Sequence, residues 1–169
     1  MSAQDALGAE EPLDLLMACH ARIRRYLGGI EALLAFPDWS DPRAIATARD
    51  CAHYFREALP LHAEDEDASV APRLLRLGLG PELAATLRRL ADEHHAIDTG
   101  CLSVVAALDS VVAGGPRTSA LQAASRPFAT LLRSHLEVEE RSVFVFLDRL
   151  PDAERPVIVA EIRARRAGG

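Results

Sequence analysis

Two short motifs place a histidine four residues before a glutamate: His62 with Glu66, and His135 with Glu139. On an α-helix, residues i and i+4 project from the same face one turn apart, so each motif presents an imidazole nitrogen beside a carboxylate oxygen. Both groups are common ligands of transition metals. A single motif of this kind equally fits a solvated charge pair on a helix surface. The interpretation therefore depends on the rest of the pattern.

Two more histidines complete a half-repeat. His20 lies 42 residues before His62, and His94 lies 41 residues before His135. This repeat predicts two equivalent metal positions, each with two histidines, and two carboxylates that can bridge them. The candidate metal ligands are His20, His62, Glu66, His94, His135 and Glu139.

Burial of these six side chains would be costly without partners, because four imidazoles and two carboxylates would face one core. Two divalent cations would offset the carboxylate charge and use the imidazole lone pairs. Carboxylate-bridged, histidine-rich sites in helical bundles favour iron or manganese, whereas zinc more often binds as an isolated ion with three or four ligands. The residue types therefore leave a pair of iron ions or a pair of manganese ions open, with zinc as the rival by ligand type. Asp67 and Glu140 are candidates to orient the ligands.

The segments that must position these residues have helical patterns. Apolar residues recur at three- and four-residue spacing, and Ala and Leu dominate them. We expect a flexible tail over residues 1–12 and one domain over residues 13–166. The predicted helices span residues 13–36, 42–71, 81–112, 118–149 and, as a short last helix, 152–166. Four long helices with short connections predict an all-α fold, an antiparallel up-down four-helix bundle with a short C-terminal fifth helix.

The positions of the turns predict the level of each histidine in the bundle. In an antiparallel helix pair, residues equidistant from the turn lie at the same level. The midpoints between successive histidines fall at residue 41, at residue 78 and between residues 114 and 115. Each midpoint lies in a break rich in Pro or Gly: residues 37–42, 78–80 and 114–115. The four histidines are therefore predicted to form one layer.

Composition narrows the class of partner. The 169-residue chain has a net charge of −6, and all 19 basic residues are arginines. Such a chain argues against nucleic-acid binding, which needs a basic face. Cys19, Cys51 and Cys101 lack metal-binding or redox spacing, so we expect buried free thiols in a reducing compartment, with Cys19 of interest because it precedes His20. The N-terminus has no signal-peptide pattern and we expect no membrane span, so we predict a cytoplasmic protein.

The order H, HxxxE, H, HxxxE resembles the hemerythrin-like (HHE cation-binding) domain family over roughly residues 13–166. Glu93-His94 resembles the family's EH pair on the third helix, and the Pro72 tail that follows Glu66-Asp67 is also similar. The resemblance implies a non-haem di-iron centre in a four-helix bundle. We therefore expect two iron ions (Fe²⁺/Fe³⁺) with an oxo or hydroxo bridge, ahead of manganese or zinc. The resemblance also implies that the protein binds O₂, NO or peroxide and acts as a sensor, store or scavenger.

One departure from the family pattern bears on function. The oxygen carriers of the family have a second histidine one turn from the first on the third helix, where this chain has Leu90 and Asp98. We treat Asp98 as a candidate additional ligand. The set of four histidines and two glutamates is similar to the branch associated with iron-centre repair and nitric oxide responses. The alternative function is therefore a di-iron enzyme for peroxide decomposition or iron-centre repair under oxidative or nitrosative stress. In a third interpretation, the bundle is an interaction module with an incidental polar core.

Overall fold

The computed structural model describes residues 10–167, and all regular secondary structure within them is helical, which confirms the all-α prediction. Most of the predicted 1–12 tail lies outside the described residues. The elements are α1 (Pro12–Ala35), α2 (Pro42–Glu64), a π-helical segment η1 (Asp65–Val70), α3 (Ala71–Arg76), α4 (Pro81–Val112), α5 (Ala120–Ser142), a 3₁₀ segment η2 (Phe144–Arg149) and α6 (Arg155–Ala167).

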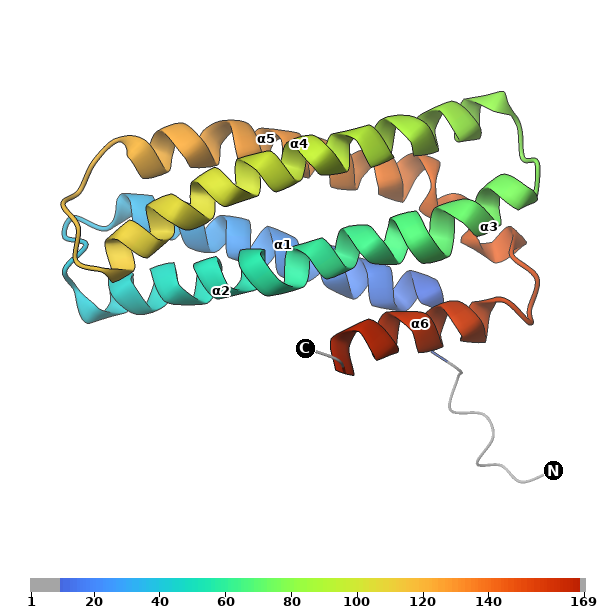
Figure 1. Cartoon of the computed structure of the whole chain (residues 1–169), viewed down its shortest axis with the longest axis horizontal. Coiled ribbons are helices and arrows are strands. Elements are labelled where there is room, and N and C mark those ends of the chain that lie inside the picture. Colours follow the sequence, from blue (N-terminus) through green and yellow to red (C-terminus); the bar gives the residue numbers. More distant parts are fainter. Residues whose placement is uncertain (1–9, 168–169) are drawn as a thin grey trace, which may run out of the picture.

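The four long helices lie side by side (Figure 1). Helix α2 packs against both α1 and α4, and α5 also packs against both α4 and α1. The connections between α1 and α2 and between α4 and α5 lie at one end of this group, and the connection between α3 and α4 lies at the other. The short α6 packs against α1 and η1. Residues far apart in the sequence are therefore brought next to one another along the contacts between these helices.

The helix boundaries follow from local chemistry. The Asp41 carboxylate accepts a hydrogen bond from the backbone N–H of Arg43 (2.8 Å), and Pro42 occupies the first helical position of α2. Gly80 (φ 115°) and Gly114 (φ 77°) adopt backbone conformations that L-residues rarely tolerate, and they lie before α4 and after it. The predicted breaks at these positions are confirmed.

Three predicted boundaries were wrong. The helix predicted over residues 42–71 is divided, because α2 widens into η1 at Asp65. Pro72 follows, and its ring would clash with the carbonyl of residue 68 in a continued α-helix. The helix predicted over residues 118–149 ends at Ser142 and is followed by η2. The last helix begins at Arg155 rather than at residue 152, with Pro156 in its first turn, where the missing N–H costs nothing.

The apolar core consists of two clusters. One cluster includes Leu27, Phe55 and Leu108, and the other includes Leu16, Leu74 and Ile158 in the part of the molecule formed with η2 and α6. The candidate ligands belong to neither cluster and form a polar layer of their own. Apolar packing therefore encloses the polar side chains and keeps bulk water away from them.

Among the described helices, α4 is long and apolar enough to span a membrane by length and composition alone, contrary to the expectation that no segment would reach this length. Core helices of soluble proteins pass the same test. Here α4 buries a face that carries His94 together with apolar residues such as Leu90 and Ile97.

Candidate metal centre

The structure brings all six predicted ligands into one buried layer. None of their side chains is more than 9% exposed. Two rings meet edge to face, with the centroids of His20 and His62 5.0 Å apart, and the centroids of His94 and His135 lie 4.7 Å apart. The histidines therefore pair within each half of the chain, as the half-repeat predicts.

The six side chains form two overlapping groups, and each group could hold a metal ion. One group is His20, His62, Glu66 and Glu139, and the other is Glu66, His94, His135 and Glu139. Within each group, one ligand atom per residue lies within 4.8 Å of all the others. Both glutamates belong to both groups, so each carboxylate is placed to bridge two ions.

The first group is loosely connected. Nε2 of His20 lies 3.3 Å from Oε2 of Glu139 and 3.9 Å from Oε1 of Glu66. Nε2 of His62 lies 3.7 Å from the same oxygen of Glu66. The two separations from Glu66 exceed hydrogen-bond length, and none of these four atoms has a hydrogen-bond partner among the described residues, so they surround a common space rather than satisfying one another.

The second group is tighter. Nε2 of His135 lies 2.8 Å from Oε1 of Glu139 and 3.0 Å from Nε2 of His94. Nε2 of His94 lies 3.4 Å from Oε2 of Glu66. Glu66 and Glu139 therefore each present one oxygen to one histidine pair and the other oxygen to the other pair.

The position of Glu66 depends on the π-helical turn. Within η1, the N–H of Ala71 donates to the carbonyl of Glu66 five residues earlier, so the backbone is wider here than in an α-helix. Asp65, which precedes Glu66, is fully buried and forms ion pairs with Arg165 (2.8 Å) and Arg166 (2.6 Å) of α6. The last helix thus holds the turn that presents Glu66, a candidate bridging carboxylate.

Three histidines have a carboxylate on the ring nitrogen that faces away from the centre. Nδ1 of His20 lies 2.7 Å from Glu140, and Nδ1 of His94 lies 2.9 Å from Asp67. An ionised carboxylate only accepts hydrogen bonds, so each Nδ1 carries the proton and each Nε2 keeps its lone pair for a metal. Asp67 and Glu140 thus occupy the orienting positions expected for them.

Sequence reasoning missed the third of these partners. Nδ1 of His135 lies 2.9 Å from Oε2 of Glu93, whose other oxygen lies 3.1 Å from Arg89. In the sequence, Glu93 is related to the site only as the neighbour of His94. The half-repeat offered no direct signal for this contact, because Glu93 does not follow a bridging glutamate as Asp67 and Glu140 do.

Asp98 does not join the centre. Its side chain is exposed, and it belongs to neither group of candidate ligands. Four residues advance an α-helix by about 400°, so Asp98 lies about 40° further round α4 than His94. From His94, the buried face of α4 extends in the other rotational direction, through Ile97 and Cys101. The suggestion of an additional carboxylate ligand at this position was therefore wrong.

Burial and mutual contacts shift the pKa values of the carboxylates and imidazoles in this layer. Burial, together with the neighbouring Glu139 carboxylate, raises the pKa of Glu66 well above its ordinary value. Burial alone would also raise the pKa of Glu139, but contacts with His135 and His20 outweigh it and lower that pKa. Burial lowers the pKa of His62 to about 3, so this imidazole is neutral near pH 7. Burial would also lower the pKa of His135, but its contacts with Glu139 and Glu93 outweigh burial and raise that pKa, so positive charge is favoured on His135 and not on His62.

Several of these buried polar atoms have no hydrogen-bond partner among the described residues. They are Nε2 of His20, both ring nitrogens of His62, both carboxylate oxygens of Glu66 and Oε2 of Glu139. Buried polar groups are normally satisfied, and leaving several unpaired in one place is costly. Divalent cations bound by Nε2 atoms and carboxylate oxygens would satisfy nearly all of them. The donor set therefore fits a pair of transition-metal ions.

Two cavities differ in their relation to the centre. A cavity of about 20 Å³ touches Glu66, His94 and Glu139 and is otherwise lined mainly by apolar side chains, including Leu90 and Phe144. It is large enough for about one water-sized molecule.

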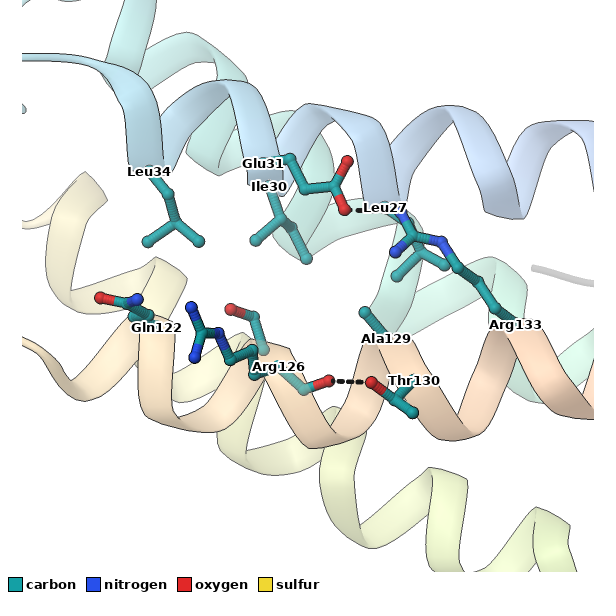
Figure 2. A pocket seen from close by; sticks show the side chains of 10 residues that line it. Leu27, Ile30, Glu31, Leu34, Gln122, Arg126, Ala129, Thr130 and Arg133 are labelled. Atoms are coloured by element: carbon teal, nitrogen blue, oxygen red, sulfur yellow. Dashed lines mark hydrogen bonds and ion pairs between the residues drawn. The ribbon is translucent and has the colours of Figure 1, made fainter.

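A larger groove of about 220 Å³ lies between α1 and α5 (Figure 2), with Leu27 and Ile30 facing Arg126 and Ala129. None of the six candidate ligands lines this groove.

Two histidine–glutamate groups that share both carboxylates, in the core of a helical domain, define a candidate dinuclear metal-binding protein. Comparison with known families agrees with this class. The model described as the hemerythrin HHE cation-binding domain matches residues 11–147. The chain therefore belongs to the hemerythrin HHE cation-binding family.

Comparisons with individual proteins and with solved structures do not extend this family assignment. A protein of Haemophilus influenzae, described only as an uncharacterized protein, is 27% identical over 89 residues. The alignment covers 50% of this chain and 49% of the relative, so the chain spans about half the length of the curated relative that it matches. No solved structure gives a significant match.

Proposed function

We propose that this protein is a non-haem di-iron protein with an antiparallel up-down four-helix bundle, and that it binds a small diatomic molecule or peroxide as a sensor, store or scavenger. The observation that carries the proposal is the pair of ligand groups sharing Glu66 and Glu139, with buried donor atoms left without partners. Manganese and zinc are alternatives by ligand type, but a carboxylate-bridged pair in a helical bundle favours iron.

The chain's own residues would divide the work between binding and shielding. His20 and His62 would hold one ion, His94 and His135 the other, and the two glutamates would bridge them. Bound iron would supply reversible redox chemistry and open coordination positions. The cavity beside Glu66 and His94 gives a small ligand access to one side of the pair, and its apolar walls exclude bulk water.

A second candidate function is favoured by one residue of that cavity. Asp67 lines the cavity, yet its side chain is 43% exposed, so a carboxylate connects the centre with solvent. Peroxide decomposition needs protons delivered to the reaction site, and a half-exposed carboxylate can relay them. Sustained turnover of peroxide would support an enzyme, whereas stoichiometric, reversible binding would support a sensor or store.

Metal analysis with an absorption spectrum tests the proposal. Protein loaded anaerobically with Fe²⁺ should hold two ions per chain, and exposure to air should produce the absorption of a bridged di-ferric centre. His62→Ala should lower metal content and melting temperature together, because it removes a ligand from one ion. One tightly bound zinc ion per chain with no iron would reject the proposal.

A further inference from the structure

The two halves of the chain contribute to the centre in the same way. Glu140 follows the bridging glutamate of the second half and contacts His20, the first histidine of the first half. Asp67 follows the bridging glutamate of the first half and contacts His94, the first histidine of the second half. Both contacts join an acid to Nδ1, at 2.7 Å and 2.9 Å. The half-repeat therefore extends to the residues that orient the ligands.

The correspondence fails at one pair of positions. Glu93 directly precedes the first histidine of the second half and contacts Nδ1 of His135. The residue that directly precedes the first histidine of the first half is Cys19. The equivalent of His135 in that half is His62, whose Nδ1 is buried and has no hydrogen-bond partner among the described residues. A cysteine thus stands where the repeat would place a carboxylate.

The surroundings of Cys19 are consistent with the missing acid. Its sulfur lies 3.3 Å from Nη2 of Arg22 and 3.4 Å from Nη2 of Arg166. Position 19 has no acid to pair with Arg166, and Nη2 of Arg166 donates a hydrogen bond to Asp65 at 2.6 Å. Two cations beside the sulfur also make it a poor place for a third cation, so the thiol does not substitute as a metal ligand.

We infer that the two metal positions are inequivalent, that the ion held by His20 and His62 is the weaker-bound one, and that the residues at positions 19 and 93 set this difference. A carboxylate on the outer nitrogen fixes the tautomer of a histidine ligand and raises its basicity, and losing such a partner typically costs 10- to 100-fold in metal affinity. His135 has this partner and His62 does not. The inference rests on the proposed function, since it requires that two ions bind.

Anaerobic calorimetric titration of the metal-free, full-length protein with Fe²⁺ alone tests this inference. The wild-type protein should show two binding steps whose affinities differ by about 10- to 100-fold. His62→Ala should remove the weaker step and leave the tighter one. A chelator added to the loaded protein should release one ion per chain much faster than the other.

Reciprocal variants identify the residues responsible. Glu93→Cys should lower the tighter affinity toward the weaker one, and Cys19→Glu should raise the weaker affinity toward the tighter one. Glu93 is partly exposed, so its replacement leaves a testable protein even if a glutamate at position 19 impairs folding. Two control variants should leave both binding steps unchanged. Glu137→Cys changes an exposed position on α5, and Cys19→Ser removes the thiol without adding a carboxylate.

The other possible results of the titrations distinguish failure of this inference from failure of the proposed function. Two ions bound with a single affinity would overturn the inequivalence. Two steps unaffected by Glu93→Cys would overturn the assignment of the difference to positions 19 and 93. Both outcomes leave the di-iron proposal intact. Loss of a metal ion in Cys19→Ser would show that the thiol is itself a ligand, which also overturns the inference. Absence of any Fe²⁺ binding would instead reject the proposed function, and the inference with it.

Discussion

Asp65 lies within 2.6 Å of Nη2 of Arg166 although its own side chain is wholly excluded from solvent. Arg165 adds a second ion pair at 2.8 Å. Both arginines come from α6, and Asp65 opens the π-helical turn that presents Glu66. Ion pairs between aspartate and arginine, which usually lie on protein surfaces, therefore hold the turn that presents the buried carboxylate of Glu66 to the candidate metal centre.

Asp65→Ala is expected to destabilise the protein by about 1.5–3 kcal/mol, the range for hydrogen bonds to charged groups. The arginines are partly exposed and can be rehydrated, which keeps the cost below that of breaking a fully buried pair. Thermal unfolding of the metal-free form measures it. Asp50→Ala, at an exposed position on α2, serves as the control, and an equal effect of both changes would refute the structural role of Asp65.

Glu66→Gln is expected to raise the stability of the metal-free protein while lowering its metal content. The folded-state pKa of Glu66 lies well above the ordinary value of 4.5, so the folded metal-free protein loses stability as pH rises above about 4.5. A neutral amide removes that loss. The difference in melting temperature between variant and wild type should therefore grow with pH. A variant that is less stable than wild type at every pH would contradict this reasoning.

Leu90→Phe is expected to leave both ions bound but to weaken the binding of nitric oxide or azide by about 5- to 150-fold. Leu90 lines the cavity of about 20 Å³ beside Glu66 and His94, and a larger side chain there costs any ligand about 1–3 kcal/mol of overpacking. Spectroscopic titration of the loaded protein measures the affinity. Leu102→Phe, at an exposed position on the same helix, should have no effect.

Asp41→Ala is expected to lower the melting temperature near neutral pH, because Asp41 caps α2. Hydrogen bonds from the Arg43 side chain and backbone lower the pKa of Asp41 to about 2, below its unfolded value of 3.8. The stabilisation is therefore fully present above pH 3.8 and is lost as pH falls through about 2. Melting curves of the two proteins should converge at the acid end, while Asp98→Ala should resemble wild type throughout.

The sequence was sufficient to predict the parts of the structure that depend on local pattern. Helical spacing placed each histidine on an apolar face, and the breaks at residues 41, 78 and 114 set them at one level. The prediction succeeded because both signals come from residues close together in the chain. The convergence of His20 with His62, and of His94 with His135, followed from them.

The parts that could not be predicted depend on contacts between distant residues. The π-helical turn at Asp65 is held by Arg165 and Arg166, about 100 residues away. The partner of His135 is Glu93, on another helix, and no spacing rule links the two. Asp98 was misplaced because a difference of about 40° around α4 decides between core and solvent, which is finer than a spacing pattern resolves.

The exchange of acids between the two halves of the chain obeys the rule of an isologous dimer interface. A residue of one half meets a residue of the other, and their equivalents meet in return: Glu140 with His20, and Asp67 with His94. The centre therefore lies on an internal pseudo-two-fold axis within a single polypeptide. A chain of half this length would complete such a centre only by pairing with a copy of itself. Any motion that separates the two halves would break up both candidate metal-binding groups at once, because each group takes a glutamate from each half.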